Sequence, residues 1–255
     1  MSENPYKSAE TETPTPSGKR PLFTPAGVIL GLVAIGITVA LLLPSVRTAR
    51  PATYRNMCLN NTKQIMLALL NYEAEHGTLP PAYSVDAEGN RLHSWRALIL
   101  PYIEGNTTHK LIDFTKPWDD PANAAAREVV MEVYLCPSAP YEDEHLTTYL
   151  AIVGAEASIT GPDGRSLGDV PGGHSHTIAV IDAPHDKAVH WMSPHDITID
   201  EVLAFDEQTR AQHRYVFIAG YLDGSAEGVD LDIERDVLRS MLTVADDTPA
   251  HLKPQ

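Results

Sequence analysis

The chain has 255 residues, of which 34 are acidic and 19 are basic, so its formal net charge at pH 7 is −15. A surface this acidic repels phosphate backbones, which argues against nucleic acid as a partner. Apolar residues make up 43% of the chain, as in an ordinary folded protein, and the length outside the termini suffices for one domain with a hydrophobic core.

The two ends of the chain are polar. The first residues are rich in Pro, Thr, Ser and Glu and carry almost no large apolar side chains. Such a segment cannot bury enough surface to offset the entropy of ordering it. We therefore expect a disordered N-terminal tail over residues 1–24, and residues 246–255 form a C-terminal tail beyond the folded domain.

The next segment predicts a transmembrane helix over residues 25–46. Ala26 to Leu43 is a run of 18 residues without a charged or amide side chain, close to the length that crosses a bilayer core. The run is longer than the apolar core of a signal peptide and lacks a clear cleavage site, so we favour a retained anchor over a cleaved leader. Pro44 and Pro51 predict a kink or a break near Ser45 to Arg50.

Gly27 and Gly31 within this helix have the spacing that lets two membrane helices approach closely. A homodimer through this face is one candidate partner, besides the membrane lipid that would surround residues 25–46. Glycine is also common in membrane helices that do not associate.

Residues 47–245 predict one α+β domain. Apolar residues at helical spacing indicate helices over 53–76, Ser94–Glu104, Pro121–Glu132 and Ile233–Thr243. Segments rich in branched and aromatic residues indicate strands near 147–154, 176–182 and 214–222. We expect the outer part of the long N-terminal helix to pack on an antiparallel sheet.

Many ordered segments of the chain resemble one bacterial family. The family consists of pilin-like proteins of unknown function with a prepilin-type N-terminal helix and a C-terminal H-x9-D-G motif, which here would be His213, Asp223 and Gly224. The resembling segments are ALLLPSVRTAR (40–50), CLNNTKQIMLALLNYEAEHGTLPPA (58–82), SWRALILPYIE (94–104), PWDDPAN (117–123), VYLCPSAP (133–140), TTYLAIVG (147–154), HTIAVID (176–182), VHWMSPHDITID (189–200) and VLRSMLT (237–243).

This resemblance implies a pseudopilin-like fold on a single-pass anchor in the cytoplasmic membrane. The N-terminus would lie in the cytoplasm and the domain outside, an orientation that the flanking charges alone leave open. No catalytic residue or cofactor is implied, and the chain carries no G-x-S-x-G, H-E-x-x-H or phosphate-loop motif. We therefore expect a structural protein rather than an enzyme, with pilin-like proteins as candidate partners.

The chain departs from the family at its leader. Leu22 stands where the family has the Gly before the cleavage site, Pro25 replaces a Leu, and Gly27 replaces the Glu that serves assembly. We accordingly expect an uncleaved anchor that does not polymerise into a pilus.

Cys58 and Cys136 are the two cysteines of the chain. In a domain outside the cytoplasm they would form a disulfide that ties the helix to the sheet half of the domain. The alternative is a pair of buried free thiols.

Five histidines crowd residues 174–195. If His174 and His176 lie on a strand, their imidazoles share one face and offer half of a metal site. The simpler interpretation is a solvated loop, because the resembling family has no histidines there. A metal- or ligand-binding module that uses the His174–His195 cluster is the alternative to the structural function.

The segment from His213 to Gly224 indicates a strand that enters a tight turn. Asp223-Gly224 favours a type I′ hairpin, in which both central residues have positive φ. The hairpin would either complete the sheet, with His213 bonding locally, or present a surface to a secretion partner.

Overall fold

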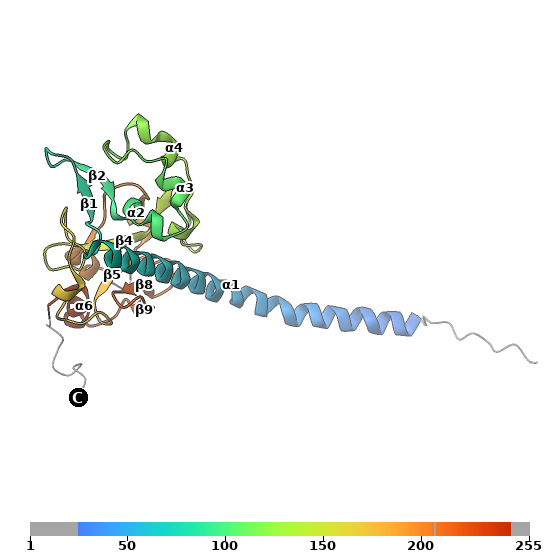
Figure 1. The fold of residues 1–255 in the computed structure, drawn as a ribbon. Helices are drawn as coiled ribbons and strands as arrows, with labels where there is room; N and C mark the ends of the chain where they lie inside the picture. Colours follow the sequence, from blue (N-terminus) through green and yellow to red (C-terminus); the bar gives the residue numbers. More distant parts are fainter. Residues whose placement is uncertain (1–24, 207, 246–255) are drawn as a thin grey trace, which may run out of the picture. The chain divides into compact units, whose positions relative to one another are not determined.

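The computed structural model describes residues 25–206 and 208–245, apart from the side chains of residues 40–51, and the predicted tails lie outside these ranges. The chain divides into two units, residues 1–48 and 49–255, and each is described by itself. The elements (Figure 1) are α1 (Pro25–His76), β1 (Tyr83–Val85), β2 (Arg91–Ser94), α2 (Trp95–Leu98), η1 (Leu100–Tyr102), α3 (Asn106–His109), η2 (Pro121–Asn123), α4 (Ala124–Arg127), η3 (Glu132–Tyr134), β3 (Leu146–Thr147), β4 (Tyr149–Val153), η4 (Leu167–Asp169), β5 (Ile178–Asp182), η5 (His185–Lys187), β6 (Val189–His190), β7 (Ile197–Thr198), α5 (Ile199–Leu203), β8 (Val216–Tyr221), β9 (Ala226–Asp230) and α6 (Arg235–Leu242).

Helix α1 has 52 residues and belongs to both units. Its backbone stays helical through Pro44 and Pro51, so the predicted break between Ser45 and Arg50 is wrong. A proline removes one backbone hydrogen bond from a helix, and the hydrogen bonds of the flanking turns suffice to continue this one.

In the first unit, the described side chains of α1 are exposed. The large apolar side chains between Val28 and Val39 are 45% to 71% exposed. Within the described ranges, no helix combines the length and the apolar character that a membrane span requires. The side chains of residues 40–46, at the end of the predicted span, lie outside the described residues. Gly31 has no atom beyond its own helix within 4 Å of where a Cβ would lie, so the predicted helix pairing stays a prediction.

The second unit is built on a five-stranded sheet with the order β7-β4-β5-β8-β9. The pairs β4–β5, β5–β8 and β8–β9 are antiparallel, and two small antiparallel pairs, β1–β2 and β3–β6, lie outside this sheet. The mixed α+β class with antiparallel sheets is therefore confirmed. The edge strand β7 differs from the prediction, because it runs parallel to β4.

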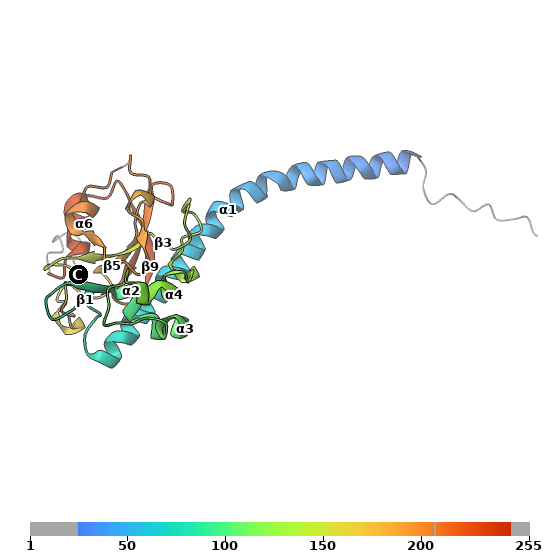
Figure 2. The same ribbon diagram turned by 90° about the horizontal axis from the view of Figure 1, so that it is seen from above.

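Side chains on the two faces of this sheet enter two different cores. Tyr149 and Ala151 of β4 pack in the core that includes Ile65 and Leu69 of α1, whereas Leu150 and Ile152 pack with side chains of α5 and α6. This alternation follows from the two-residue repeat of a strand. The sheet is thus a middle layer, with the second half of α1 on one face and α6 on the other (Figure 2).

A glycine lets α1 approach the sheet closely. A Cβ added at Gly220 of β8 would lie 2.6 Å from Cγ of Met66 and 2.8 Å from Cγ2 of Thr62, and both of these α1 side chains are fully buried. At Gly220, strand β8 therefore presents only backbone to the side chains of Thr62 and Met66.

The short helices depart from the predicted lengths. Ser94–Glu104 divides into α2 and η1, because Pro101 has no N–H to donate and lies in the first turn of η1. Pro121–Glu132 contains η2 and α4, and its last residue is the first residue of a separate single turn, η3. The predicted C-terminal helix over Ile233–Thr243 is confirmed as α6.

We predict that Gly220→Ala lowers the free energy of unfolding by about 1–3 kcal/mol, because the added methyl group overpacks the contact between β8 and α1. The matched control is Gly168→Ala, where the nearest atom to the new Cβ is Ser166 Oγ at 3.6 Å, an ordinary contact distance. Urea unfolding of both variants measures the difference. Equal unfolding free energies for the two variants would contradict the described packing of α1.

Candidate functional site

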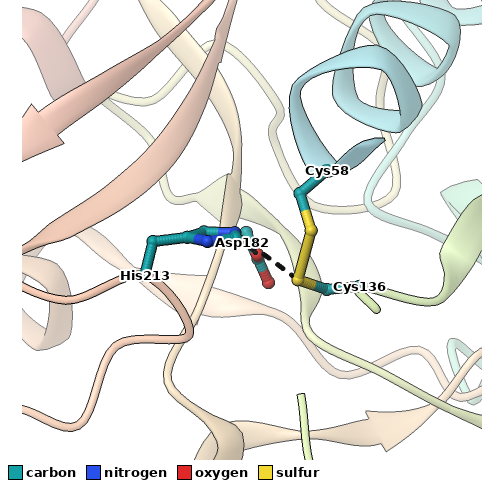
Figure 3. Close-up of side chains that lie close together, drawn as sticks. All are labelled: Cys58, Cys136, Asp182 and His213. Atoms are coloured by element: carbon teal, nitrogen blue, oxygen red, sulfur yellow. Dashed lines mark hydrogen bonds and ion pairs between the residues drawn. A yellow bond between two sulfur atoms is a disulfide. The ribbon is translucent and has the colours of Figure 1, made fainter. Parts of the chain in front are cut away.

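A disulfide joins α1 to the chain beyond η3. Cys58 and Cys136 are bonded, with their Cα atoms 5.3 Å apart and a sequence separation of 78. Both residues are fully buried. Figure 3 shows the bond between their sulfur atoms. The Cα separation is usual for a disulfide. The predicted pairing is therefore confirmed, and the alternative of two free thiols is wrong.

His213 lies beside this disulfide (Figure 3). Its Nε2 atom is 3.6 Å from Cys136 Sγ and 3.5 Å from Asp182 Oδ2, and the residue is 7% exposed. The backbone of His213 also bridges to Val216 at the start of β8. His213 thus bonds locally to Val216 and also lies close to Cys136 and Asp182, which are distant in sequence.

Asp182 ends β5 with its carboxyl group turned into the same cluster. Oδ1 accepts a hydrogen bond from Thr148 Oγ1, and among the described residues Oδ2 has no hydrogen-bond partner. The 3.5 Å separation from His213 Nε2 is too long for a good hydrogen bond. Burial raises the pKa of Asp182 above its ordinary value, and the nearby His213 and Thr148 offset this only in part.

The cluster has the composition of a metal-ligand set. One ligand atom from each of Cys58, Cys136, Asp182 and His213 lies within 4.8 Å of the others, and all four residues are buried. In the described part of the chain, no other group of three or more such residues is gathered this closely.

The predicted pair of His174 and His176 is placed differently. Both are exposed and precede β5 in a turn, so the strand that was expected to align them is absent there. His174 Nε2 lies 3.0 Å from the carbonyl oxygen of Leu167, and His176 Nδ1 lies 3.1 Å from Ser175 Oγ. The strand prediction failed because the turn hydrogen bond from His176 N–H to Gly173 O holds this segment out of the sheet.

Asp223 and Gly224 lie in the turn that closes the hairpin between β8 and β9. Gly224 has a φ of 88°, whereas Asp223 does not have a positive φ, so the predicted type I′ turn is wrong. The N–H of Gly224 donates to Tyr221 O, which makes a turn followed by one left-handed glycine. A Cβ at Gly224 would lie 3.4 Å from Leu70 of α1. His213 thus lies beside the sulfur that is bonded to α1, and Gly224 leaves only ordinary contact distance between a Cβ and Leu70 of α1.

A second buried polar group was not predicted. Arg96 of α2 is fully buried, and its Nη1 donates to Asp196 Oδ1 at 2.7 Å. The guanidinium also donates to four backbone carbonyl oxygens, those of Tyr149, Trp191, Ser193 and His195. Asp196 Oδ1 accepts two further hydrogen bonds, from Trp95 Nε1 and Ala151 N. The available signal was one arginine within the otherwise apolar run SWRALIL.

A family model described as a protein of unknown function (DUF1559) matches residues 47–203. The match covers Cys58, Cys136 and Asp182, whereas His213 lies beyond it. No curated protein matches the chain. No solved structure matches it either.

We predict that Arg96→Met lowers the free energy of unfolding by about 3–5 kcal/mol, because it leaves the carboxylate of Asp196 buried without its cation. The control is Lys187→Met, which breaks an ion pair with Glu201 whose side chains are 39% and 42% exposed. That change should cost about 1 kcal/mol or less. Denaturant unfolding compares the two variants. Equal losses of unfolding free energy would show that the buried Arg96–Asp196 pair supports the fold no more than the exposed pair does.

We predict a pH dependence from Asp182. A carboxyl whose pKa is raised by folding contributes stability that is complete below its unfolded pKa, about 4, and is lost as the pH rises through the folded pKa. The unfolding free energy of the wild type minus that of Asp182→Asn should therefore fall as the pH rises above about 4.

Urea unfolding across this pH range measures the difference, and the exposed Asp186→Asn serves as the control. A difference for Asp182→Asn that rises with pH would contradict the assignment of a buried, disfavoured carboxylate.

Proposed function

The chain belongs to the DUF1559 family of proteins of unknown function, and we propose that it is a membrane-anchored, pilin-like structural protein. Residues 25–46 would cross the cytoplasmic membrane once, with the N-terminus in the cytoplasm. The α+β domain would then lie outside, as part of a surface or secretion-associated structure.

The observation that carries this proposal is the exposed apolar surface at the start of α1. The helix exposes 56% to 71% of the large apolar side chains of Ile29, Leu30, Ile35 and Ile37. At these spacings they lie on more than one side of the helix. A helix on the surface of a globular domain turns one apolar stripe inward and a polar face outward. Apolar side chains on several sides suit a helix surrounded by lipid.

The second half of the same helix supports the pilin-like assignment. From Cys58 to Leu70, α1 packs on the sheet, where Gly220 and Gly224 allow close contact. A single helix that carries an apolar segment first and a sheet-packing segment second is the arrangement expected from the resemblance to pilin-like proteins.

The disulfide supports the location of the domain. Disulfides persist in oxidising compartments and are rare in the cytosol. The Cys58–Cys136 bond thus favours a domain outside the cytoplasm.

The structure does not favour the alternative module built on the His174–His195 cluster. His174 and His176 bond to their local surroundings, and within the described ranges these histidines join no group of three ligands. The absence of enzymatic activity and the pairing through Gly27 and Gly31 remain predictions.

We predict that the full-length protein stays in the membrane fraction after an alkaline carbonate wash. The double variant Ile29→Lys/Ile35→Lys should move to the soluble fraction, because a charge at the centre of a span costs about 2.5–3.5 kcal/mol.

The matched control is Met57→Lys/Leu67→Lys, which places the same charges on exposed apolar positions of α1 outside the span. Immunoblotting of both fractions reads out the result. Release of the wild type by carbonate, or equal release of both double variants, would contradict the proposed membrane anchor.

A further inference from the structure

The cluster around the disulfide contains a buried hydrogen-bond acceptor without a donor. Asp182 is 1% exposed, yet its Oδ2 atom has no hydrogen-bond partner among the described residues. Its nearest polar neighbour is His213 Nε2, which also faces Cys136 Sγ. A buried carboxylate oxygen without a partner is costly, and a cation at this point would remove the cost.

The donor atoms around this point match one metal. Two cysteine sulfurs, one imidazole nitrogen and one carboxylate oxygen make a four-ligand set of the kind that zinc binds tetrahedrally. Their ligand atoms already lie within 4.8 Å of one another. We propose that Cys58, Cys136, Asp182 and His213 bind one Zn²⁺ ion when the two cysteines are thiols, so that the metal and the disulfide are alternative closures of the same cluster.

The two closures differ in electrons and protons. Every chain carries the two cysteines as thiols before its disulfide forms, and Zn²⁺ binding converts them to thiolates with release of two protons. Forming the disulfide instead removes two electrons and the same two protons, which a disulfide oxidant accepts as it becomes a dithiol. Return to the thiol form needs a dithiol reductant.

A surface hollow offers a route for the ion. A hollow of about 600 Å³ is lined by Cys136 and by three acidic side chains, those of Glu104, Glu132 and Glu144. Clustered carboxylates attract cations from solution and raise their local concentration. The hollow therefore places clustered carboxylates beside Cys136.

The metal would connect the two segments that the disulfide joins and two more, the end of β5 and the chain before β8. Cys58 lies on α1, Cys136 follows η3, Asp182 ends β5, and His213 precedes β8. A chain that folds before oxidation would thus hold α1 on the sheet through the metal. This inference does not depend on the proposed membrane anchor.

The test uses the full-length protein in two forms. One keeps the disulfide, and the other is reduced with a phosphine, which becomes a phosphine oxide as water supplies its oxygen and the two thiol hydrogens. Each form is incubated with Zn²⁺, freed of unbound metal, and measured for zinc per chain. Co²⁺ in place of Zn²⁺ reports thiolate ligands and tetrahedral geometry from its absorption spectrum.

We expect one zinc per chain in the reduced form and none in the cluster of the disulfide form. His213→Ala and Asp182→Asn should each weaken zinc binding by at least about tenfold. Even substitutions of residues that only hydrogen-bond to metal ligands lower metal affinity by about 10–100-fold. The controls His176→Ala and Asp186→Asn alter exposed residues of the same types and should bind as the wild type does. In the reduced wild type, Zn²⁺ should also protect both cysteines from alkylation, a readout that needs no variant.

Several results would overturn the proposal. Reduced protein that takes up no zinc, with its cysteines alkylated equally fast in the presence and absence of Zn²⁺, rules out the site. Zinc uptake that is unchanged in His213→Ala and Asp182→Asn places the metal elsewhere. Zinc uptake by the disulfide form that equals uptake by the reduced form also places the metal elsewhere.

Discussion

The disulfide between Cys58 and Cys136 joins α1 to the chain beyond η3, and it lies beside Asp182 at the end of β5 and His213 before β8. It closes 78 positions of sequence, and a loop of this length is worth about 4–5 kcal/mol in the chain-entropy model. The packing of α1 on the sheet extends the tie along the helix, since Gly220 opens the face of β8 to Thr62 and Met66. The covalent bond fixes one point of the helix, and the glycine contact fixes its distance from the strand.

The two buried polar groups of the domain have different characters. Arg96 neutralises Asp196 and crosslinks the carbonyl oxygens of the segment from Trp191 to His195, so this group consists of a balanced charge pair inside a cage of backbone. The Oδ2 atom of each carboxylate has no hydrogen-bond partner among the described residues, but Asp182 has only His213 as a counter-ion, at 3.5 Å instead of the 2.7 Å of the Arg96 pair. The first group suits a permanent support of the fold, whereas the second suits a site whose occupancy changes with the state of the cysteines.

These arrangements also explain what could be predicted from sequence. The second half of α1, the strand segments and α6 were predictable because their apolar spacing is local and because burial on the sheet rewards that spacing. The Cys58–Cys136 pair was predictable for another reason, since the chain has two cysteines and the apolar segment favoured an oxidising compartment. The lengths of α2 and α4 were not, because short helices depend on tertiary contacts more than on propensity.

The surroundings of His213 and Arg96 could not be predicted, because their partners are distant in sequence. His213 meets Asp182 and Cys136 only once β5, β8 and the chain after η3 have come together. Arg96 looked like a polar position on a short helix, and its partner Asp196 is 100 positions away. The turn at Asp223-Gly224 was misassigned because the dipeptide is common to several hairpin types, and the contact of Gly224 with Leu70 of α1 has no local signature.

The most direct test of this account is peptide mapping of the protein isolated from its native cells with free thiols blocked at lysis. We predict that digestion without reduction yields one peptide pair joined through Cys58 and Cys136, with neither cysteine labelled. Recovery of both cysteines in blocked form, with no linked pair, would contradict the claim that a disulfide joins α1 to the chain beyond η3.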